Sequence, residues 1–224
     1  MISRLSGPLY KVTIFIGTLF LVNTLIFLTN IPFIFSLVFI PLKTENLIPI
    51  ILTAIPLGPA LVGGYAVIWR YMCTGEYSVW QRFWKGYTAN FWQTLGLSAL
   101  VAFFIALLTY NLQLMMASGR MALFFYPTII LLGGLIPVFF VACLLISRFE
   151  MPGRNIVINT LFFMIKNPVK SLMALLMIIL FYVVVALTAW KVLYLLLFSL
   201  PLYLLLINYR ELIRLLEIEK GFEY

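Results

Sequence analysis

The chain has 224 residues, of which 64% are hydrophobic and only 10% are charged, and its formal net charge is +8. Soluble domains average about half apolar and a quarter charged residues, so the polar side chains here are too few to cover a water-soluble particle. The composition therefore excludes a soluble globular protein and predicts an integral membrane protein.

The residue types that most enzyme chemistry needs are missing from the sequence. There is no histidine and no aspartate, which excludes histidine-based triads, histidine metal sites and aspartyl dyads. No nucleophile–base pair, phosphate-binding loop or metal cluster stands in their place. Cys73 and Cys143 lie in or beside apolar runs, as small buried hydrophobes do. We expect a protein that is not an enzyme and that uses no cofactor or metal.

Six apolar runs predict an all-α, polytopic bundle of six transmembrane helices in a single domain. The first run is longer than one bilayer crossing, so we expect it to tilt or to kink at Pro32. The expected spans cover residues 12–39, 47–69, 91–116, 121–146, 171–187 and 192–208.

Lysine and arginine are distributed unevenly among the loops that join these spans. Twelve of the fifteen fall on the side that holds both termini, and Lys43, Arg120 and Lys191 fall on the other side. Because cytoplasmic loops carry the excess of positive charge, the sequence predicts a multi-pass protein with both termini in the cytoplasm. We expect the tail, residues 209–224, to extend the sixth helix along the membrane surface.

One cytoplasmic connection, residues 78–90, is expected to form an amphipathic helix. Its aromatic residues gather on one face: Trp80, Phe83, Trp84 and Tyr87. Arg82 and Lys85 fall largely opposite. Tryptophan and tyrosine favour the headgroup layer, so a helix lying on lipid is one interpretation and a docking helix for a partner is the other. We expect no nucleic-acid binding, because few basic residues flank these aromatics.

The connection before the fifth span, residues 155–166, has the same plan and includes Phe162. A shift of 78 residues overlays the two halves of the chain, so that Pro59 falls on Pro137 and Arg70 on Arg148. The matches are few, so a duplicated unit and chance agreement both stay open.

Charged residues lie at the ends of spans or in loops, with Arg70, Arg148 and Glu150 at the inner ends of the second and fourth spans. Snorkelling to the headgroups is the simpler explanation for these three, and a functional charge is the other. Uncharged polar residues occur within the spans: Asn23, Thr24, Thr53, Gln93, Thr94 and Ser98. We expect them to form helix–helix hydrogen bonds. The alternative is that they line a path for a small neutral solute, which would make the chain a stand-alone channel or facilitator.

Short motifs in both halves resemble one family of bacterial membrane proteins. They are Gly58-Pro59-Ala60, the segment "FWKGYTANFWQ", and "SRFE" followed by "NTLFFMIKNPVKSL". The chain resembles the YesL-like family of uncharacterised membrane proteins over nearly its whole length. Members of that family tend to accompany carbohydrate ABC importers and polysaccharide-degrading enzymes of Gram-positive bacteria. The resemblance therefore implies a non-enzymatic accessory subunit of such an importer in the bacterial cytoplasmic membrane.

On this hypothesis the partners are the lipid bilayer and the permease and ATPase subunits of the importer, with self-association left open. The residues expected to bind a partner belong mainly to the two cytoplasmic connections: Trp80, Phe83, Trp84, Tyr87, Arg148, Glu150 and Phe162.

Overall fold

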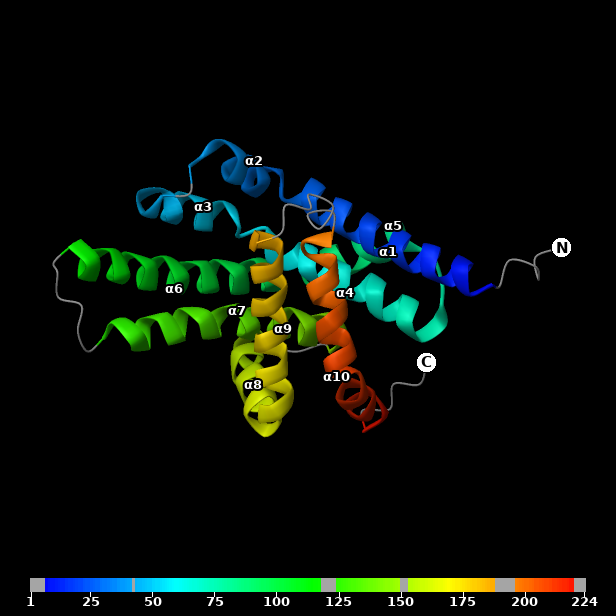
Figure 1. Cartoon of the computed structure of the whole chain (residues 1–224). Helices are drawn as coiled ribbons and strands as arrows, with labels where there is room; N and C mark the ends of the chain where they lie inside the picture. Colours follow the sequence, from blue (N-terminus) through cyan, green and yellow to red (C-terminus); the bar gives the residue numbers. More distant parts are fainter. Residues whose placement is uncertain (1–6, 42, 118–123, 150–152, 188–195, 220–224) are drawn as a thin grey trace.

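The computed structural model describes residues 7–41, 43–117, 124–149, 153–187 and 196–219, and this part of the chain is built from helices and short connections (Figure 1). The first two helices are α1 (Pro8–Thr29) and α2 (Ile31–Phe39). They are separated at Asn30, two residues before Pro32. The kink expected at Pro32 is thus a break between two helices, because proline cannot supply the N–H that a continuous helix needs there.

The side chain of Asn30 stabilises this break. Its Nδ2 donates a hydrogen bond of 2.9 Å to the carbonyl oxygen of Ile26. In an unbroken helix that oxygen would accept from the backbone N–H four residues later, but the Asn30 N–H donates to Phe27 instead. The amide side chain therefore replaces the lost backbone bond inside an apolar environment, where an unpaired carbonyl is costly.

The second expected span is also divided. After a 3₁₀ turn (Thr44–Asn46), α3 (Leu47–Thr53) and α4 (Leu57–Thr74) follow one another with a bend of 49° between them. α4 is the central helix, since it packs against α1, α5, α6, α7 and α10. Its residues from Gly58 to Trp69 are buried, with the exception of Ala66. Glycine and alanine in this stretch let the neighbouring helices approach closely.

α5 (Val79–Ala89) folds back onto α4 after a turn at Gly75, which takes the left-handed conformation with φ 70°. A helix at residues 78–90 was expected, and its presence is confirmed. Part of its apolar face, however, is already used by protein, because Phe83 is fully buried in the core formed with α4.

The second half of the chain forms the remaining helices. They are α6 (Phe91–Ala117), α7 (Phe125–Arg148), α8 (Gly153–Lys166), α9 (Pro168–Leu187) and α10 (Ser199–Glu219). α6 and α7 lie side by side, while α9 packs against α10 and crosses α7 (Figure 1). The helix at the connection 155–166 ends where it was expected to end, because α8 ends at Lys166 and α9 begins at Pro168.

The all-helical architecture is confirmed in the described residues, which hold four to five candidate membrane spans, but six spans are not confirmed. α1, α6, α7 and α9 are long and apolar enough to cross a membrane, and α3 with α4 makes a fifth candidate if the bent pair counts as one span. The start of the sixth expected span lies outside the described residues. Its helix, α10, contains the charged residues Arg210, Glu211 and Arg214 and is not among the candidate membrane spans.

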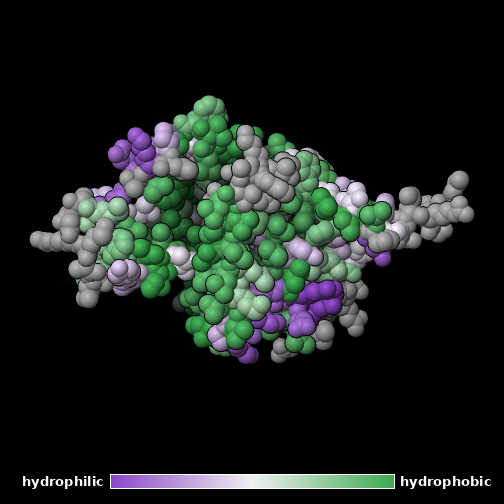
Figure 2. All heavy atoms as spheres, viewed as in Figure 1, coloured by the Kyte–Doolittle hydropathy of each residue, from purple (hydrophilic) through white to green (hydrophobic). Residues whose placement is uncertain are grey.

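The surface agrees with embedding in a bilayer. Figure 2 shows hydrophobic side chains over much of the molecule, α9 included, while hydrophilic ones gather near the α2–α3 connection and over the second half of α10. Large apolar side chains such as Phe103 on α6 and Leu180 on α9 are exposed. A soluble monomer rarely exposes so much apolar surface, whereas lipid-facing helices do.

The positions of Pro59 and Pro137 do not decide whether the two halves of the chain, overlaid by a shift of 78 residues, are a duplicated unit. Pro59 lies in the first turn of α4, where proline fits without loss of a hydrogen bond. Pro137 lies inside α7, where it removes one. The two prolines therefore act differently, although they fall on one another in the overlay.

Candidate functional site

α5 has an aromatic face and a basic face. The aromatic face carries Phe83, which is 0% exposed, and Trp80, which is 62% exposed. Trp84 and Tyr87 lie between these extremes. The burial of Tyr87 raises the pKa of its phenol above the ordinary value, so this side chain stays neutral at physiological pH.

The aromatic rings of this face contact one another in sequence. Trp80 and Trp84 meet edge to face with centroids 5.6 Å apart, and Trp84 meets Tyr87 at 5.3 Å. Tyr87 in turn lies 5.4 Å from Phe91 at the start of α6. Such pairs add to simple burial and restrict the rotamers of each ring. We call Trp80, Trp84 and Tyr87 the aromatic ladder.

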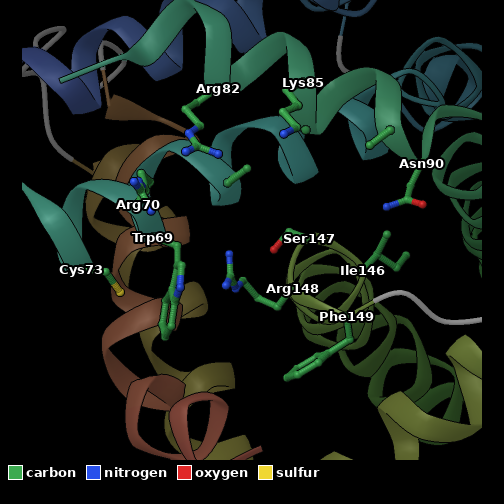
Figure 3. Close-up of a pocket in the computed structure, with 13 residues that line it drawn as sticks. Trp69, Arg70, Cys73, Arg82, Lys85, Asn90, Ile146, Ser147, Arg148 and Phe149 are labelled. Carbon is green, nitrogen blue, oxygen red and sulfur yellow. The ribbon is translucent and has the colours of Figure 1, made fainter. Parts of the chain in front are cut away.

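The other face of α5 carries the cations and turns toward α4 and α7. Together these three helices enclose a pocket of about 370 Å³ (Figure 3). We call it the basic pocket. Its lining residues are Ala66, Trp69, Arg70, Cys73, Arg82, Lys85, Gly86, Ala89, Asn90, Ile146, Ser147, Arg148 and Phe149.

Four cations, Arg70, Arg82, Lys85 and Arg148, line this one pocket. Figure 3 shows Arg82 and Lys85 reaching from α5 toward the side chains of α4 and α7. One of these cations is paired with an acid, since the carboxylate of Glu76 accepts a hydrogen bond of 2.9 Å from Arg70 Nε. That bond, together with the charge of Arg70, holds the pKa of Glu76 below its ordinary value.

The two arginines of the span ends are held in different ways. Arg70 is paired with Glu76, at a site where both side chains are partly exposed. The guanidinium of Arg148 lies over the ring of Trp69, with 4.9 Å between its central carbon and the ring centroid. A cation over an indole face is attracted by the ring quadrupole. Both arginines line the basic pocket, so snorkelling alone does not describe their placement.

The expected partner-binding residues do not form a single surface. Arg148 lines the basic pocket, while Phe162 on α8 is 66% exposed and lines a separate apolar groove with Phe149, Leu212 and Leu216. Phe83 is buried in the core formed with α4, so its expected contact with a partner stays a prediction. Glu150 lies outside the described residues.

Sequence reasoning missed the pocket itself. Arg82 and Lys85 read as the solvated side of an amphipathic helix, and only the return of α5 onto α4 turns them toward Arg70. The available signal was the spacing of Arg82, Lys85, Gly86 and Ala89, which places two cations and two small residues on one helical face.

Polar side chains within the expected spans form hydrogen bonds within and between helices. Ser98 donates to the carbonyl oxygen of Thr94 at 2.8 Å, and Thr53 and Ser36 join α3 to α2 at 2.8 Å. The Asn23 Oδ1 atom accepts the backbone N–H of Phe198 at 2.9 Å, which joins α1 to the start of α10. The bonds of Thr53 and Asn23 are of the helix–helix kind that was expected, whereas Ser98 bonds within its own helix.

The structure offers no metal-binding group in the part of the chain that it describes. No three side chains among its His, Cys, Asp and Glu residues gather closely enough to hold an ion. Cys73 and Cys143 are both free thiols, with Cys143 buried and Cys73 at the wall of the basic pocket.

Comparison with protein-family models, with curated proteins and with solved structures finds no match to this chain. The resemblance to the YesL-like family therefore stays a prediction.

Proposed function

We propose that this chain is a non-enzymatic accessory subunit of a larger membrane assembly, and that it docks on its partner through the aromatic ladder of α5. One contrast carries the proposal. Phe83 is fully buried against α4, whereas Trp80, on the same helix, is 62% exposed. α5 is thus fixed to the bundle by one aromatic residue and presents another outward.

A tryptophan held in this way is suited to anchoring a partner. The contacts of Trp80 with Trp84 and of Trp84 with Tyr87 limit the conformations that binding would otherwise have to restrict. Tryptophan and tyrosine also supply much of the binding free energy at protein interfaces. The resemblance to the YesL-like family supplies the partner in this proposal, which is the permease or ATPase subunit of a carbohydrate ABC importer.

The proposal includes an orientation. The four cations of the basic pocket lie near the ends of α4 and α7, and cytoplasmic segments carry most of the positive charge in membrane proteins. We place this end of the bundle, with α5, in the cytoplasm of a bacterial cell.

Native co-purification tests the docking role. The protein is isolated from its own membranes at endogenous level, and bound subunits are identified by mass spectrometry. We expect permease and ATPase subunits with the wild type, and about tenfold less of them with Trp80→Ala, as for an interface anchor worth more than about 1 kcal/mol.

Tyr126→Ala is the matched control, because Tyr126 is an exposed aromatic residue near the opposite end of α7. It should retain the partner at the wild-type level. A wild-type protein that elutes alone, or a Trp80→Ala variant that keeps its partner as the control does, would contradict the proposal.

A stand-alone channel for a small neutral solute stays an untested alternative. The residues on which it depended, such as Thr53, Ser98 and Asn23, are engaged in hydrogen bonds within and between helices. Solute flux into liposomes that contain only this protein would establish it, and intact protein without flux would exclude it.

A further inference from the structure

The basic pocket carries more positive charge than its described surroundings balance. Arg82 and Lys85 form no ion pair with a described residue, and Arg70 shares its charge with Glu76 alone. Cations brought close together repel one another, and the repulsion is stronger beside low-dielectric protein and lipid than in water. An arrangement of this kind is stabilised by an anion between the cations.

The donors in the pocket suit a phosphate group. Arginine presents several N–H groups in a planar fork that matches phosphate oxygens, and lysine adds a compact charge. Arg82 and Lys85 come from α5 and Arg70 from α4, so their groups reach the pocket from different helices (Figure 3). The amide side chain of Asn90 lies at the same wall.

Trp69 gives a second, independent indication of a ligand. The side chain is 1% exposed, and its indole Nε1 has no hydrogen-bond partner among the described residues. A buried N–H without an acceptor is unfavourable, because it has lost its hydrogen bond to water and gained none in return. Figure 3 shows this nitrogen on the side of the ring that faces Arg148, where the pocket lies.

Apolar side chains also line the pocket, which lies near one end of two long helices. Ile146 and Phe149 close the pocket beside the cations. The pocket adjoins the last turns of α4 and α7, which are candidate membrane-spanning helices. The phosphates of a bilayer lie at that level, with glycerol and acyl chains on the membrane side of them.

We infer that the basic pocket is a binding site for a phosphate ester, and that the bilayer supplies it as the headgroup of an anionic phospholipid. Arg82, Lys85 and Arg70 bind the phosphate oxygens, the Trp69 N–H donates to one of them, and Ile146 and Phe149 contact the apolar part of the lipid. This inference goes beyond the docking role proposed above and does not depend on it.

Lipid retention in nanodiscs of defined composition tests the site. The full-length protein is placed in phosphatidylcholine nanodiscs with or without 10 mol% phosphatidylglycerol, where 10 mol% is a chosen test fraction, and retained lipids are counted by native mass spectrometry. We expect the wild type to retain phosphatidylglycerol about tenfold more than its share of the bilayer, because several cations contact one phosphate. In Arg82→Gln/Lys85→Gln this preference should disappear.

A matched control separates the pocket from general charge. Lys166→Gln/Arg214→Gln removes the same charge outside the basic pocket, and it should keep the preference within about twofold, because charges in contact with solvent are screened. Equal loss in both double variants, or a wild type without any preference for anionic lipid or phosphate, would overturn the inference.

A soluble source of the same chemistry is distinguished in a parallel arm. Inorganic phosphate and glycerol 3-phosphate are titrated into the protein in pure phosphatidylcholine nanodiscs by calorimetry. Saturable binding that Arg82→Gln/Lys85→Gln abolishes, without preference for phosphatidylglycerol, would keep the phosphate site and overturn the assignment to lipid. Preference for the lipid without soluble binding supports the inference as stated.

If Arg82→Gln/Lys85→Gln folds poorly, Glu76→Gln provides a second test of the same site. Gln cannot hold Arg70 by charge, so Arg70 becomes available to the phosphate, and retention of phosphatidylglycerol should rise about twofold or more. A fall in retention in this variant would contradict a role for Arg70 at the site.

Discussion

Gly63 of α4 lies directly against Phe83 of α5. A Cβ atom placed on Gly63 would come within 2.9 Å of the Phe83 carbonyl oxygen and within 3.1 Å of its ring. The reverse contact has the same character, because a Cβ on Gly86 would come within 2.8 Å of the Ala66 side chain. Because each helix has a glycine at the contact, the two backbones approach closely, as small residues allow in membrane bundles.

We expect Gly63→Ala to push α5 away from α4. The added methyl group meets a backbone oxygen, which cannot move like a flexible side chain, so the free energy of unfolding should fall by about 1–3 kcal/mol. Thermal denaturation in detergent, followed by circular dichroism, measures the change. Gly96→Ala is the control, since a Cβ there meets nothing within 4 Å. Equal midpoints for the two variants would show that the contact is not tight.

The bond between Asn23 and Phe198 predicts a second effect on stability. Asn23→Leu keeps similar bulk but leaves the Phe198 N–H without its acceptor in a buried place, which should destabilise the bundle by about 1–3 kcal/mol. Thr24→Val serves as the control, because Thr24 donates only to the carbonyl oxygen of Phe20 in its own helix at an exposed position. If the two variants unfold at the same temperature, the link between α1 and α10 is not significant.

The two cysteines provide a test of orientation without engineering. Cys73 lies partly exposed at the wall of the basic pocket, and Cys143 is 0% exposed. A membrane-impermeant maleimide should therefore label Cys73 in inverted vesicles and not in intact cells, while Cys143 reacts only after denaturation. Cys73→Ser should abolish the native labelling. Labelling in intact cells would place the pocket outside and contradict the charge-based orientation.

Acid should strengthen anion binding in the basic pocket. The Arg70 hydrogen bond lowers the pKa of Glu76, so the ion pair is present above the ordinary carboxyl pKa and is lost as the pH falls through the lowered value. Arg70 and Arg82 are the charges that act on this carboxyl. Once Glu76 is protonated, Arg70 is released to the phosphate.

Retention of phosphatidylglycerol is therefore expected to rise about twofold as the pH falls below the ordinary carboxyl pKa, a small change because the pair is partly exposed. The same nanodisc assay measures it, since the phosphodiester keeps its charge over this range. Glu76→Gln should show no such step. A wild type whose retention falls with acid would contradict the role assigned to Glu76.

Most helix positions could be predicted from the sequence, because apolar length and the breaks at proline and glycine are local properties. α6 matches its expected span almost to the residue, and α8 ends at Lys166, the expected end of the second connection. The limit appears at α10, where Arg210, Glu211 and Arg214 follow an apolar run without a break in the helix. An apolar run ends at the first charge, whereas a helix continues as long as its backbone bonds do.

The basic pocket could not be predicted, for a different physical reason. An amphipathic helix has the same sequence pattern whether its apolar side meets lipid or protein. What decides between them for α5 is the fit of Gly63 and Gly86, which belong to different helices. That fit also turns Arg82 of α5 toward Arg148 of α7. These two residues are far apart along the chain, so no periodic pattern in the sequence reveals that they lie at the same pocket.

The position of α4 in the centre of the bundle has a consequence for biosynthesis. α4 packs against α1, which is made before it, and also against α7 and α10, which leave the ribosome much later. Until α10 emerges, one side of α4 contacts only lipid or the insertion machinery. The core of this protein is therefore completed only once α10 has been made, and a chain that stops before α10 presents the quality-control proteases with an unfinished central helix.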